Sequence, residues 1–239
     1  MTSTQPQEIA CGEITLAGRL HRPQGEPRGA AVIAHGLYSS MQSEKLNRLA
    51  AALAEAGYLA LMFDSTGCGD SPGDVRQTTL TSRHDELLAA VEHLARLAPG
   101  LPLAYLGSSL GGTAALLAAD TRPPACTVVW SAPSDLQELF MRLRSRPDPP
   151  ELPAMARDLG RHDLEGLLGR LSRVLWVHGE QDEVVPVSQA RRGHQLLRQP
   201  KKLVLLPGAD HRFTRPEDQQ AAIGHTLDWL ERFLGPESH

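Results

Sequence analysis

Short apolar runs alternate with longer amphipathic segments along most of this chain, and this alternation is the feature that most constrains its fold. Residues 30–34 form a short apolar run, and in the following residues 43–56 Leu46, Leu49 and Leu53 recur at helical spacing. The same pairing of an apolar run with a helical segment repeats toward the C-terminus. Apolar strands that alternate with helices predict a mainly parallel sheet covered by helices on both faces.

The individual elements follow from the same periodicities. The expected strands are 8–11, 14–21, 30–34, 58–63, 101–106, 127–130, 173–177 and 203–206, with the first two forming an antiparallel pair. The expected helices are 43–56, 81–97, 110–119, 188–197 and a last one that starts near Pro216, with a core face of Ile223, Leu227, Leu230 and Leu234.

The alternation breaks between residues 133 and 171, where no strand pattern is present. This stretch is rich in leucine and arginine and is interrupted by Pro147, Pro149, Pro150 and Pro153. We interpret it as a short helical cap inserted between two strands of a single domain that spans residues 1–239. The plain alternative is a set of ordinary sheet-covering helices with long connections.

Composition excludes several classes of protein. The formal charge of −4 and the 4% of aromatic residues give no reason to expect nucleic-acid binding. The sequence has no apolar run of about 18 residues, so no membrane span is expected. The first residues lack the pattern of a secretory signal. Cys11, Cys68 and Cys126 are far apart and odd in number, which argues against a disulfide framework or a zinc site. We therefore expect a reduced, cytoplasmic protein.

A nucleophile motif lies between an expected strand and an expected helix, in residues 106–112. Ser109 has glycine two positions before and two positions after it, whereas Ser108 has leucine at both places. A serine on a sharp strand-to-helix turn needs small neighbours at these positions. Ser109 is therefore the candidate nucleophile, and the N–H of Leu110 at the helix start is a candidate oxyanion donor.

A serine needs a base, and position selects one of the ten histidines. His211 directly follows the strand 203–206, at the edge of the sheet where α/β proteins place their ligands. His178 ends another strand, but its place there is more typical of sheet packing. His84, His93, His194 and His225 fall on expected helices.

The carboxylate that orients the base should lie in a similar loop. Asp182 follows the strand 173–177 and is our candidate, with Asp135 as the rival after the strand 127–130. Either residue could instead only bond backbone amides in a turn. For the second oxyanion donor, residues 34–38 follow a strand directly, and the N–H of Leu37 could face the same point as that of Leu110. We interpret His35 as structural.

The segment 63–73 is rich in Gly, Asp, Ser and Pro and follows a strand. It lacks the glycine-lysine order of a phosphate-binding loop, so we interpret it as a structural turn region. Nothing near Cys68 marks that residue as a reactive thiol.

Five motifs resemble those of the α/β-hydrolase superfamily and occur in its order. They are His35-Gly36-Leu37, Asp64-x-x-Gly67-x-Gly69-x-Ser71, Gly107-Ser108-Ser109-Leu110-Gly111-Gly112, Gly179-Glu180-Gln181-Asp182 and Gly208-Ala209-Asp210-His211. Within the superfamily the chain is most similar to small bacterial esterases of the feruloyl/cinnamoyl-esterase and serine-aminopeptidase-like groups. The resemblance implies an eight-stranded, mostly parallel sheet, a Ser109–His211–Asp182 triad, an oxyanion hole from the Leu37 and Leu110 N–H groups, and neither a metal nor an organic cofactor.

These features predict a serine hydrolase that cleaves small-molecule carboxylic esters through an acyl-enzyme. Two alternatives stay open, with the oligomeric state unassigned in each. The same triad could cleave a thioester or a small peptide or aminoacyl amide, or the chain could be a hydrolase-like scaffold that binds a ligand without turning it over.

Overall fold

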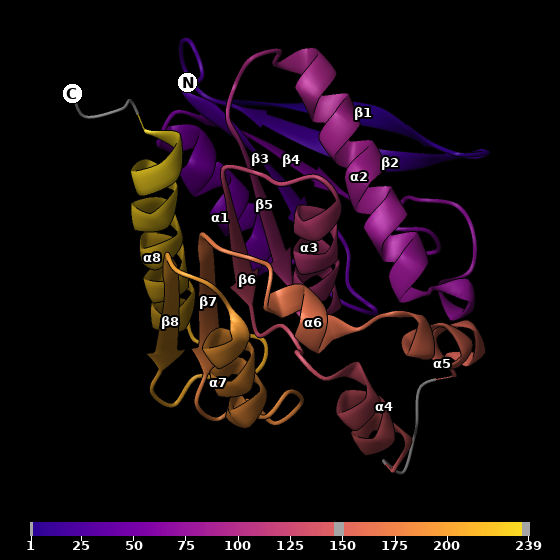
Figure 1. Cartoon of the computed structure of the whole chain (residues 1–239). Helices are drawn as coiled ribbons and strands as arrows, with labels where there is room; N and C mark the ends of the chain where they lie inside the picture. Colours follow the sequence, from indigo (N-terminus) through magenta and orange to yellow (C-terminus); the bar gives the residue numbers. More distant parts are fainter. Residues whose placement is uncertain (1, 146–150, 236–239) are drawn as a thin grey trace.

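Eight strands form one sheet in the order β1-β2-β4-β3-β5-β6-β7-β8 (Figure 1). The computed structural model describes residues 2–145 and 151–235. The strands are β1 Ser3–Cys11, β2 Ile14–Arg22, β3 Gly29–Ala34, β4 Tyr58–Phe63, β5 Leu103–Ser108, β6 Cys126–Trp130, β7 Val174–Gly179 and β8 Lys201–Leu206. β1 pairs antiparallel with β2 and β2 with β4, whereas the remaining pairs from β4 to β8 are parallel. The predicted mainly parallel sheet is confirmed.

The helices lie where the apolar periodicity places them. They are α1 Glu44–Glu55, α2 Leu80–Leu97, α3 Leu110–Thr121, α4 Leu136–Arg144, α5 Pro153–Asp158, α6 Leu164–Leu168, α7 Val187–Leu196 and α8 Pro216–Leu234, with 3₁₀ turns η1 Val75–Gln77 and η2 Leu159–Arg161. The five predicted helices outside residues 133–171 agree with these bounds to within two residues where both ends were predicted. The largest error concerns β1, which begins at Ser3 rather than at residue 8, because its first residues are exposed and carry no apolar pattern.

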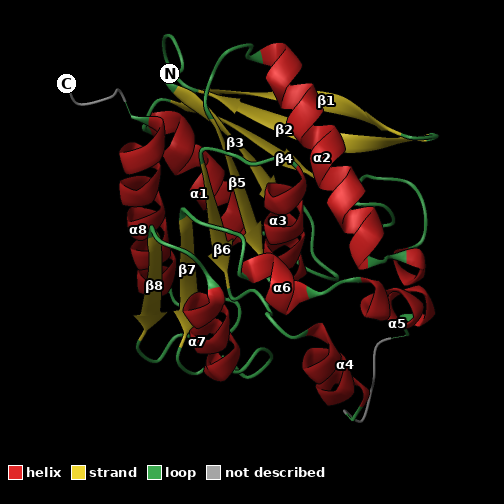
Figure 2. Cartoon of the chain, in the orientation of Figure 1, coloured by secondary structure: helices red, strands yellow, loops and turns green. Residues whose placement is uncertain are grey.

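Helices cover both faces of the sheet (Figure 2). Along β3, Ala30, Val32 and Ala34 join an apolar cluster that includes α2, α3 and α7. The intervening Ala31 and Ile33 join a second cluster that includes α1 and α8. Every residue of β3 is buried, as expected for a central parallel strand.

Two helices bury residues that the periodicity did not predict. In α8, Trp229 is buried and Leu227 only partly so, which shifts the core face from the predicted one. In α2, Arg83 and Glu86 are both 2% exposed. A polar side chain gives no hydrophobic signal, so its burial is invisible to a pattern of apolar residues.

Between β6 and β7 the chain forms α4, α5, η2 and α6 and no strand within the described residues, as the sequence predicts. Residues 146–150, with Pro147, Pro149 and Pro150, lie outside the described residues. Pro153 begins α5, a position where its missing N–H costs nothing. In Figure 1 the arrowheads of β7 and β8 point to the bottom of the view, where α4 and α7 also lie.

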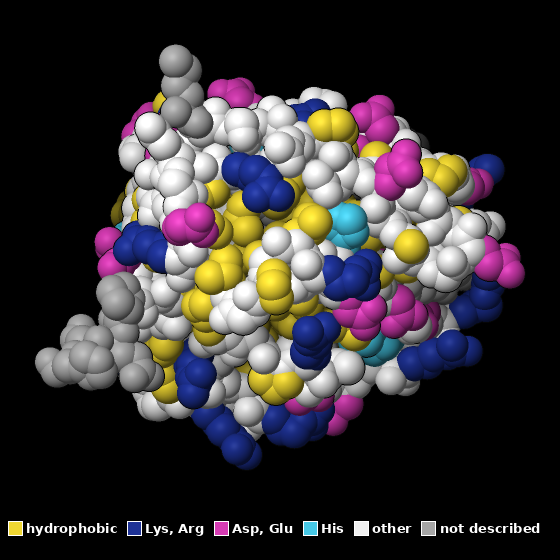
Figure 3. All heavy atoms as spheres, turned by 90° about the horizontal axis from the view of Figure 1, so that it is seen from above, with side chains coloured by type: hydrophobic (Ala, Val, Ile, Leu, Met, Phe, Trp, Pro, Cys, Tyr) yellow, Lys and Arg dark blue, Asp and Glu magenta, His cyan; other side chains and the backbone are white. Residues whose placement is uncertain are grey.

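The opposite end of the molecule has a mixed surface. Figure 3 shows this end, where positive and negative side chains are interspersed with apolar ones. Within 2–145 and 151–235, no helix combines the length and apolar character needed to cross a bilayer.

Candidate active site

Ser109 sits on a strained turn between β5 and α3. Its φ of 54° and ψ of −125° are unusual for a residue with a side chain. A Cβ on Gly107 would lie 2.2 Å from the carbonyl oxygen of Gly111, and a Cβ on Gly111 would lie 2.4 Å from that of Ala34. The turn therefore requires both glycines of the motif. It is held in place by the N–H of Ser109, which donates to the carbonyl of Trp130 at 2.8 Å.

His211 reaches the serine from the loop that follows β8. Its Nε2 lies 3.1 Å from Ser109 Oγ. Two residues later Phe213, at φ 53° and fully buried, packs on Trp130 with ring centroids 5.8 Å apart. This buried aromatic ring fixes the loop to the core, and the histidine is thereby held at the carboxyl edge of the sheet.

Asp182 lies on the other side of His211, in the loop after β7. Its Oδ2 is 2.8 Å from His211 Nδ1, and its Oδ1 accepts the N–H groups of Val184 at 2.9 Å and Val185 at 2.7 Å. A carboxylate only accepts, so Nδ1 carries the proton and Nε2 is free to accept one from Ser109. The structure thus brings together the three side chains selected from the sequence.

Backbone contacts join the acid loop to the base loop. The N–H of Gln181 donates to the carbonyl of Ala209 at 3.0 Å, and the N–H of His211 donates to the Glu183 carboxylate at 3.2 Å. A Cβ on Gly179 would lie 2.3 Å from the Ala209 oxygen. Glycine at this position is what allows the two loops to lie against each other.

The loop after β3 lies next to the serine. A Cβ on Gly36 would be 3.1 Å from Ser109 Cβ and 3.6 Å from its Oγ. Across the described residues, the N–H groups of Leu37 and Leu110 donate to no protein acceptor. Two unpaired donors on either side of a serine are the arrangement that an oxyanion requires.

His35 ties this loop to the segment after β4. Its Nδ1 lies 2.7 Å from the carbonyl of Gly36, and its Nε2 accepts the N–H of Ser65 at 3.0 Å. Burial, helped by the positive charge of Arg83, lowers the pKa of His35 to about 3. His35 is therefore neutral and holds the Gly36–Leu37 peptide, whose N–H is the candidate donor.

The turn region 63–73 is held together by hydrogen bonds and contacts residues that follow the loop after β3. The buried Asp64 carboxylate accepts the N–H of Met41 at 2.6 Å and that of Asp70 at 2.9 Å, and Ser71 Oγ donates to the Asp64 carbonyl at 2.6 Å. A Cβ on Gly69 would collide with the Asp64 carboxylate. These contacts agree with the structural role expected from the sequence.

Cys68 lies in the same turn region and is buried. Burial raises the pKa of its thiol, and Arg83 Nη2 lies 3.5 Å from its sulfur. The described residues contain no group of three or more His, Cys, Asp or Glu side chains arranged to hold a metal ion.

The rival residues have other positions. Asp135 caps α4 by accepting the N–H of Glu138 at 2.9 Å. His178 is buried at the end of β7 as expected, but its Nε2 also lies 3.3 Å from Asp182 Oδ2, a contact that the sequence interpretation missed. No local sequence pattern signals this contact, because His178 ends a strand and Asp182 lies in the loop that follows it. Lys45 was also missed: its ammonium lies 5.2 Å from the centre of the Phe213 ring, and burial lowers its pKa to about 8.

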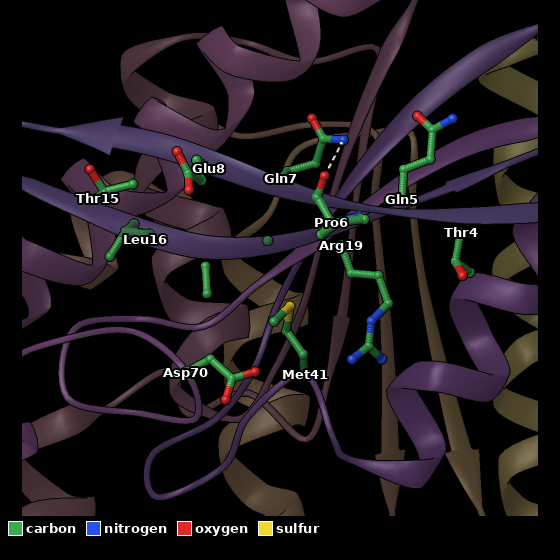
Figure 4. A pocket seen from close by; sticks show the side chains of 12 residues that line it. Thr4, Gln5, Pro6, Gln7, Glu8, Thr15, Leu16, Arg19, Met41 and Asp70 are labelled. Carbon is green, nitrogen blue, oxygen red and sulfur yellow. Dashed lines mark hydrogen bonds between the residues drawn. The ribbon is translucent and has the colours of Figure 1, made fainter.

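Two hollows open on the surface near these elements. The first, of about 550 Å³, lies between the β1–β2 hairpin and residues Met41 and Asp70, and none of its lining residues belongs to the triad (Figure 4). The second, of about 510 Å³, borders the loop after β3 and is lined by Tyr38, Ser39, Cys68 and Val75 among others. Because Tyr38 directly follows Leu37, the second hollow adjoins the candidate oxyanion loop.

A strand-to-helix serine served by a histidine and an aspartate from later loops defines an α/β hydrolase. Residues 25–146 match the family described as serine aminopeptidase, S33, and the chain belongs to this family. The predicted α/β-hydrolase fold and its relationship to small bacterial esterases are thereby confirmed.

Solved structures share this fold, and curated relatives match over most of the chain. Est1E from Butyrivibrio proteoclasticus, in a structure with ferulic acid bound, is 23% identical with a TM-score of 0.80, over 94% of this chain and 99% of that one. The esterase domain of a Rhodothermus marinus protein is 26% identical with a TM-score of 0.77, over 98% of this chain and all of that one (100%). A Mycobacterium tuberculosis protein provisionally named as a phosphoribosyl transferase is 27% identical over 235 residues, which are 96% of this chain and 46% of the relative. The chain thus spans about half the length of the first curated relatives it matches.

Proposed function

We propose that this protein is a serine hydrolase that cleaves carboxylic esters of small molecules through an acyl-enzyme intermediate. The observation that carries the proposal is the unbroken row of contacts from Ser109 Oγ through His211 to the buried Asp182 carboxylate, at 3.1 and 2.8 Å. These are the distances at which a base takes a proton from a serine hydroxyl.

In the proposed reaction, Ser109 Oγ attacks the ester carbonyl carbon while its proton passes to His211 Nε2. The oxygen that becomes negative is bound by the N–H groups of Leu37 and Leu110. The carbon–oxygen bond to the alcohol then breaks, and the alcohol leaves with the proton from His211. Water attacks the acyl-serine by the same route, giving its proton to His211, and the acid and free Ser109 are released. Asp182 holds the imidazole throughout.

We further propose that residues 133–171 form a cap that shapes the substrate site of a single domain. The apolar side chains of this segment join the same cluster as Leu37 and Leu110, which supports its placement beside the site. The hollow lined by Tyr38 would hold one side of the ester, and Tyr38→Ala should then change KM more than kcat. A cytoplasmic location is part of the proposal, supported by three cysteines that are all free thiols.

The family description favours a second candidate, the hydrolysis of an aminoacyl or small peptide amide. Such a substrate carries an ammonium group that needs a carboxylate partner. The carboxylates of the described part of the segment that take a hydrogen bond or ion pair within the protein are Asp135, Glu138, Asp158, Asp163 and Glu165. Glu151, exposed in the same segment, has no such contact among the described residues and could meet the ammonium group, so matched substrates must decide between the two candidates. Relative kcat/KM values for matched ester, thioester and aminoacyl-anilide probes distinguish the candidates.

This chain spans only 46% of the Mycobacterium tuberculosis relative, so a phosphoribosyl transferase activity of that protein need not lie in the shared part. The ferulic acid in the Est1E structure suggests esters of hydroxycinnamic acids as further probes.

The direct test uses p-nitrophenyl esters of increasing acyl length with the native protein, Ser109→Ala and Ser108→Ala. We expect Ser109→Ala to lose on the order of 10⁴-fold or more in turnover. Ser108→Ala, which changes the adjacent serine, should retain activity within a few-fold. A fluorophosphonate probe should label the native protein and Ser108→Ala but not Ser109→Ala. Equal turnover by native protein and Ser109→Ala would overturn the proposal, and a folded native protein that takes no label would favour the non-catalytic scaffold.

A further inference from the structure

A second histidine, His178, lies against the Asp182 carboxylate. His178 Nε2 is 3.3 Å from Asp182 Oδ2 and 2.9 Å from the carbonyl oxygen of Val185. The side chains of His178 and Asp182 are both fully buried, at 0% exposure. Because both neighbouring oxygens only accept hydrogen bonds, Nε2 must carry the ring proton.

The imidazole of His178 is neutral. Burial lowers its pKa, and this effect outweighs the favourable contacts with Val185 and Asp182. Its Nδ1 is buried and has no partner in the described part of the chain, as suits an unprotonated nitrogen with a lone pair. His178 is thus a neutral donor and adds no positive charge beside the carboxylate.

Both oxygens of Asp182 lie within reach of His211 Nδ1, at 3.0 Å for Oδ1 and 2.8 Å for Oδ2, but their other partners differ. Oδ1 accepts the backbone N–H groups of Val184 and Val185. Oδ2 faces two imidazoles, Nδ1 of His211 at 2.8 Å and Nε2 of His178 at 3.3 Å. Without His178, Oδ2 would contact only His211, and the carboxylate would be restrained mainly through Oδ1.

We propose that His178 is a positioning residue of this site: its Nε2–H fixes the turn Asp182–Val185 to β7 and directs Asp182 Oδ2 at His211. This inference rests on the proposed function, since it assigns His178 an effect on catalysis. Groups that orient metal-ligating side chains typically contribute about 10- to 100-fold to activity, and we expect an effect of similar size here.

Two substitutions distinguish the effect of the Nε2–H donor of His178 from the effect of the volume of its ring. His178→Leu keeps an apolar volume but has no donor, whereas His178→Gln places an amide N–H near the position of Nε2. We expect His178→Leu to lower kcat for a p-nitrophenyl ester by about 10- to 100-fold with KM changed by less than about 2-fold. His178→Gln should restore kcat to within a few-fold of the native value.

A double-mutant cycle with Asp182→Asn tests whether the effect passes through the carboxylate. If His178 acts on Asp182, then His178→Leu should lower kcat by less than about 2-fold in the Asp182→Asn background. A general structural contribution would instead lower kcat by the same factor in both backgrounds, and that result would overturn the proposal. Thermal unfolding of each variant confirms that folded protein is compared.

A measurement on the native protein covers the case in which His178→Leu does not fold. With ¹⁵N-labelled histidine, the NMR spectrum should show His178 neutral at pH 7 with its proton on Nε2. A proton on Nδ1, or a charged His178 at that pH, contradicts the inference. These outcomes are separate from the failure of the proposed function, which would show as undiminished turnover by Ser109→Ala.

Discussion

The carboxyl edge of the sheet and the helical segment between β6 and β7 are held by different kinds of contact. At the edge, backbone packs directly on backbone, so that a Cβ on Gly107 would lie 2.2 Å from the carbonyl oxygen of Gly111. In the helical segment, a Cβ added to Gly160 would have no heavy atom within 4 Å. Glu165 of the segment pairs with Arg192 of α7, and both side chains are more than half exposed. Close backbone packing therefore fixes the positions of Ser109, His211 and Asp182 at the edge, whereas the exposed side chains of the segment have space around them.

The largest expected effect comes from one added methyl group at the edge. Gly107→Ala places a Cβ inside the van der Waals radius of a backbone carbonyl that belongs to the turn around Ser109. We expect a loss of about 3 kcal/mol or more in the free energy of unfolding, together with loss of ester turnover. Chemical denaturation and a turnover assay measure both.

The matched control is Gly160→Ala in the helical segment. Its φ is not in the left-handed region and the space around it is open, so the free energy of unfolding should change by less than about 1 kcal/mol. If the two alanine variants proved equally stable and equally active, the contrast between the regions would be wrong.

The second prediction compares the two aspartates that the sequence offered. Asp182→Asn removes the acceptor that fixes the proton on His211 Nδ1, and kcat should fall by on the order of 10³- to 10⁴-fold. Asp135→Asn affects the cap of α4, where asparagine also caps well, and the exposed ion pair with Arg192. Neither belongs to the triad, so kcat should stay within a few-fold of the native value. Initial rates on one ester at saturation give both numbers, and a larger loss from Asp135→Asn would reverse the assignment.

The sequence predicted the edge well because steric demands there leave few choices of residue. The sequence shows directly that glycine stands two positions before and two positions after Ser109, as the turn requires. The loops that follow parallel strands must also meet at one edge of the sheet. The contact of His178 with Asp182 was not predicted, because a buried polar pair follows no apolar period and its partner depends on the bend of the loop after β7.

The helical segment was predicted only as helical, and for a physical reason. Its helices are short, so few residues define the apolar face of each. Their positions depend on contacts between residues far apart in the sequence, such as that of Asp158 with Thr81, which no local pattern predicts. Substrate selectivity, which depends on this segment in the proposed function, is therefore the property least accessible to the sequence.

The third prediction concerns the pH dependence of the free energy of unfolding, to which the buried His35 contributes. His35 has a pKa of about 3 in the folded chain against 6.5 in its unperturbed state, so between these values the unfolded chain binds a proton that the folded chain does not. The free energy of unfolding therefore falls as the pH is lowered from about 6.5 toward 3, by up to about 1.4 kcal/mol per pH unit from this residue. Urea unfolding at several pH values measures the slope.

Two variants isolate the contribution of His35. His35→Gln should flatten the pH dependence, although it also lowers stability at pH 7 through altered hydrogen bonds to Gly36 and Ser65. His93→Gln removes a histidine whose pKa burial also lowers, but which is less deeply buried, so the slope should change less. An unchanged slope in His35→Gln would contradict a neutral, buried His35.

The smallest expected effect concerns the ion pairs that join the helical segment to α7. Arg192 on α7 contacts Glu165 on α6 and lies 3.8 Å from Asp135, but its side chain is 55% exposed. Ion pairs with this exposure contribute about 0 to 1 kcal/mol and weaken in salt. Arg192→Ala should therefore lower the free energy of unfolding by less than about 1 kcal/mol, and by less still at high salt. Arg191→Ala, at the neighbouring residue that faces Glu180 at 3.9 Å, is the control outside the segment. A loss above about 2 kcal/mol would mean that surface charges hold the segment in place.

A loss below about 1 kcal/mol would instead leave the buried leucines of α4 and α6 as the main contacts of the segment. Apolar contacts of that kind tolerate exchange of the exposed residues around them.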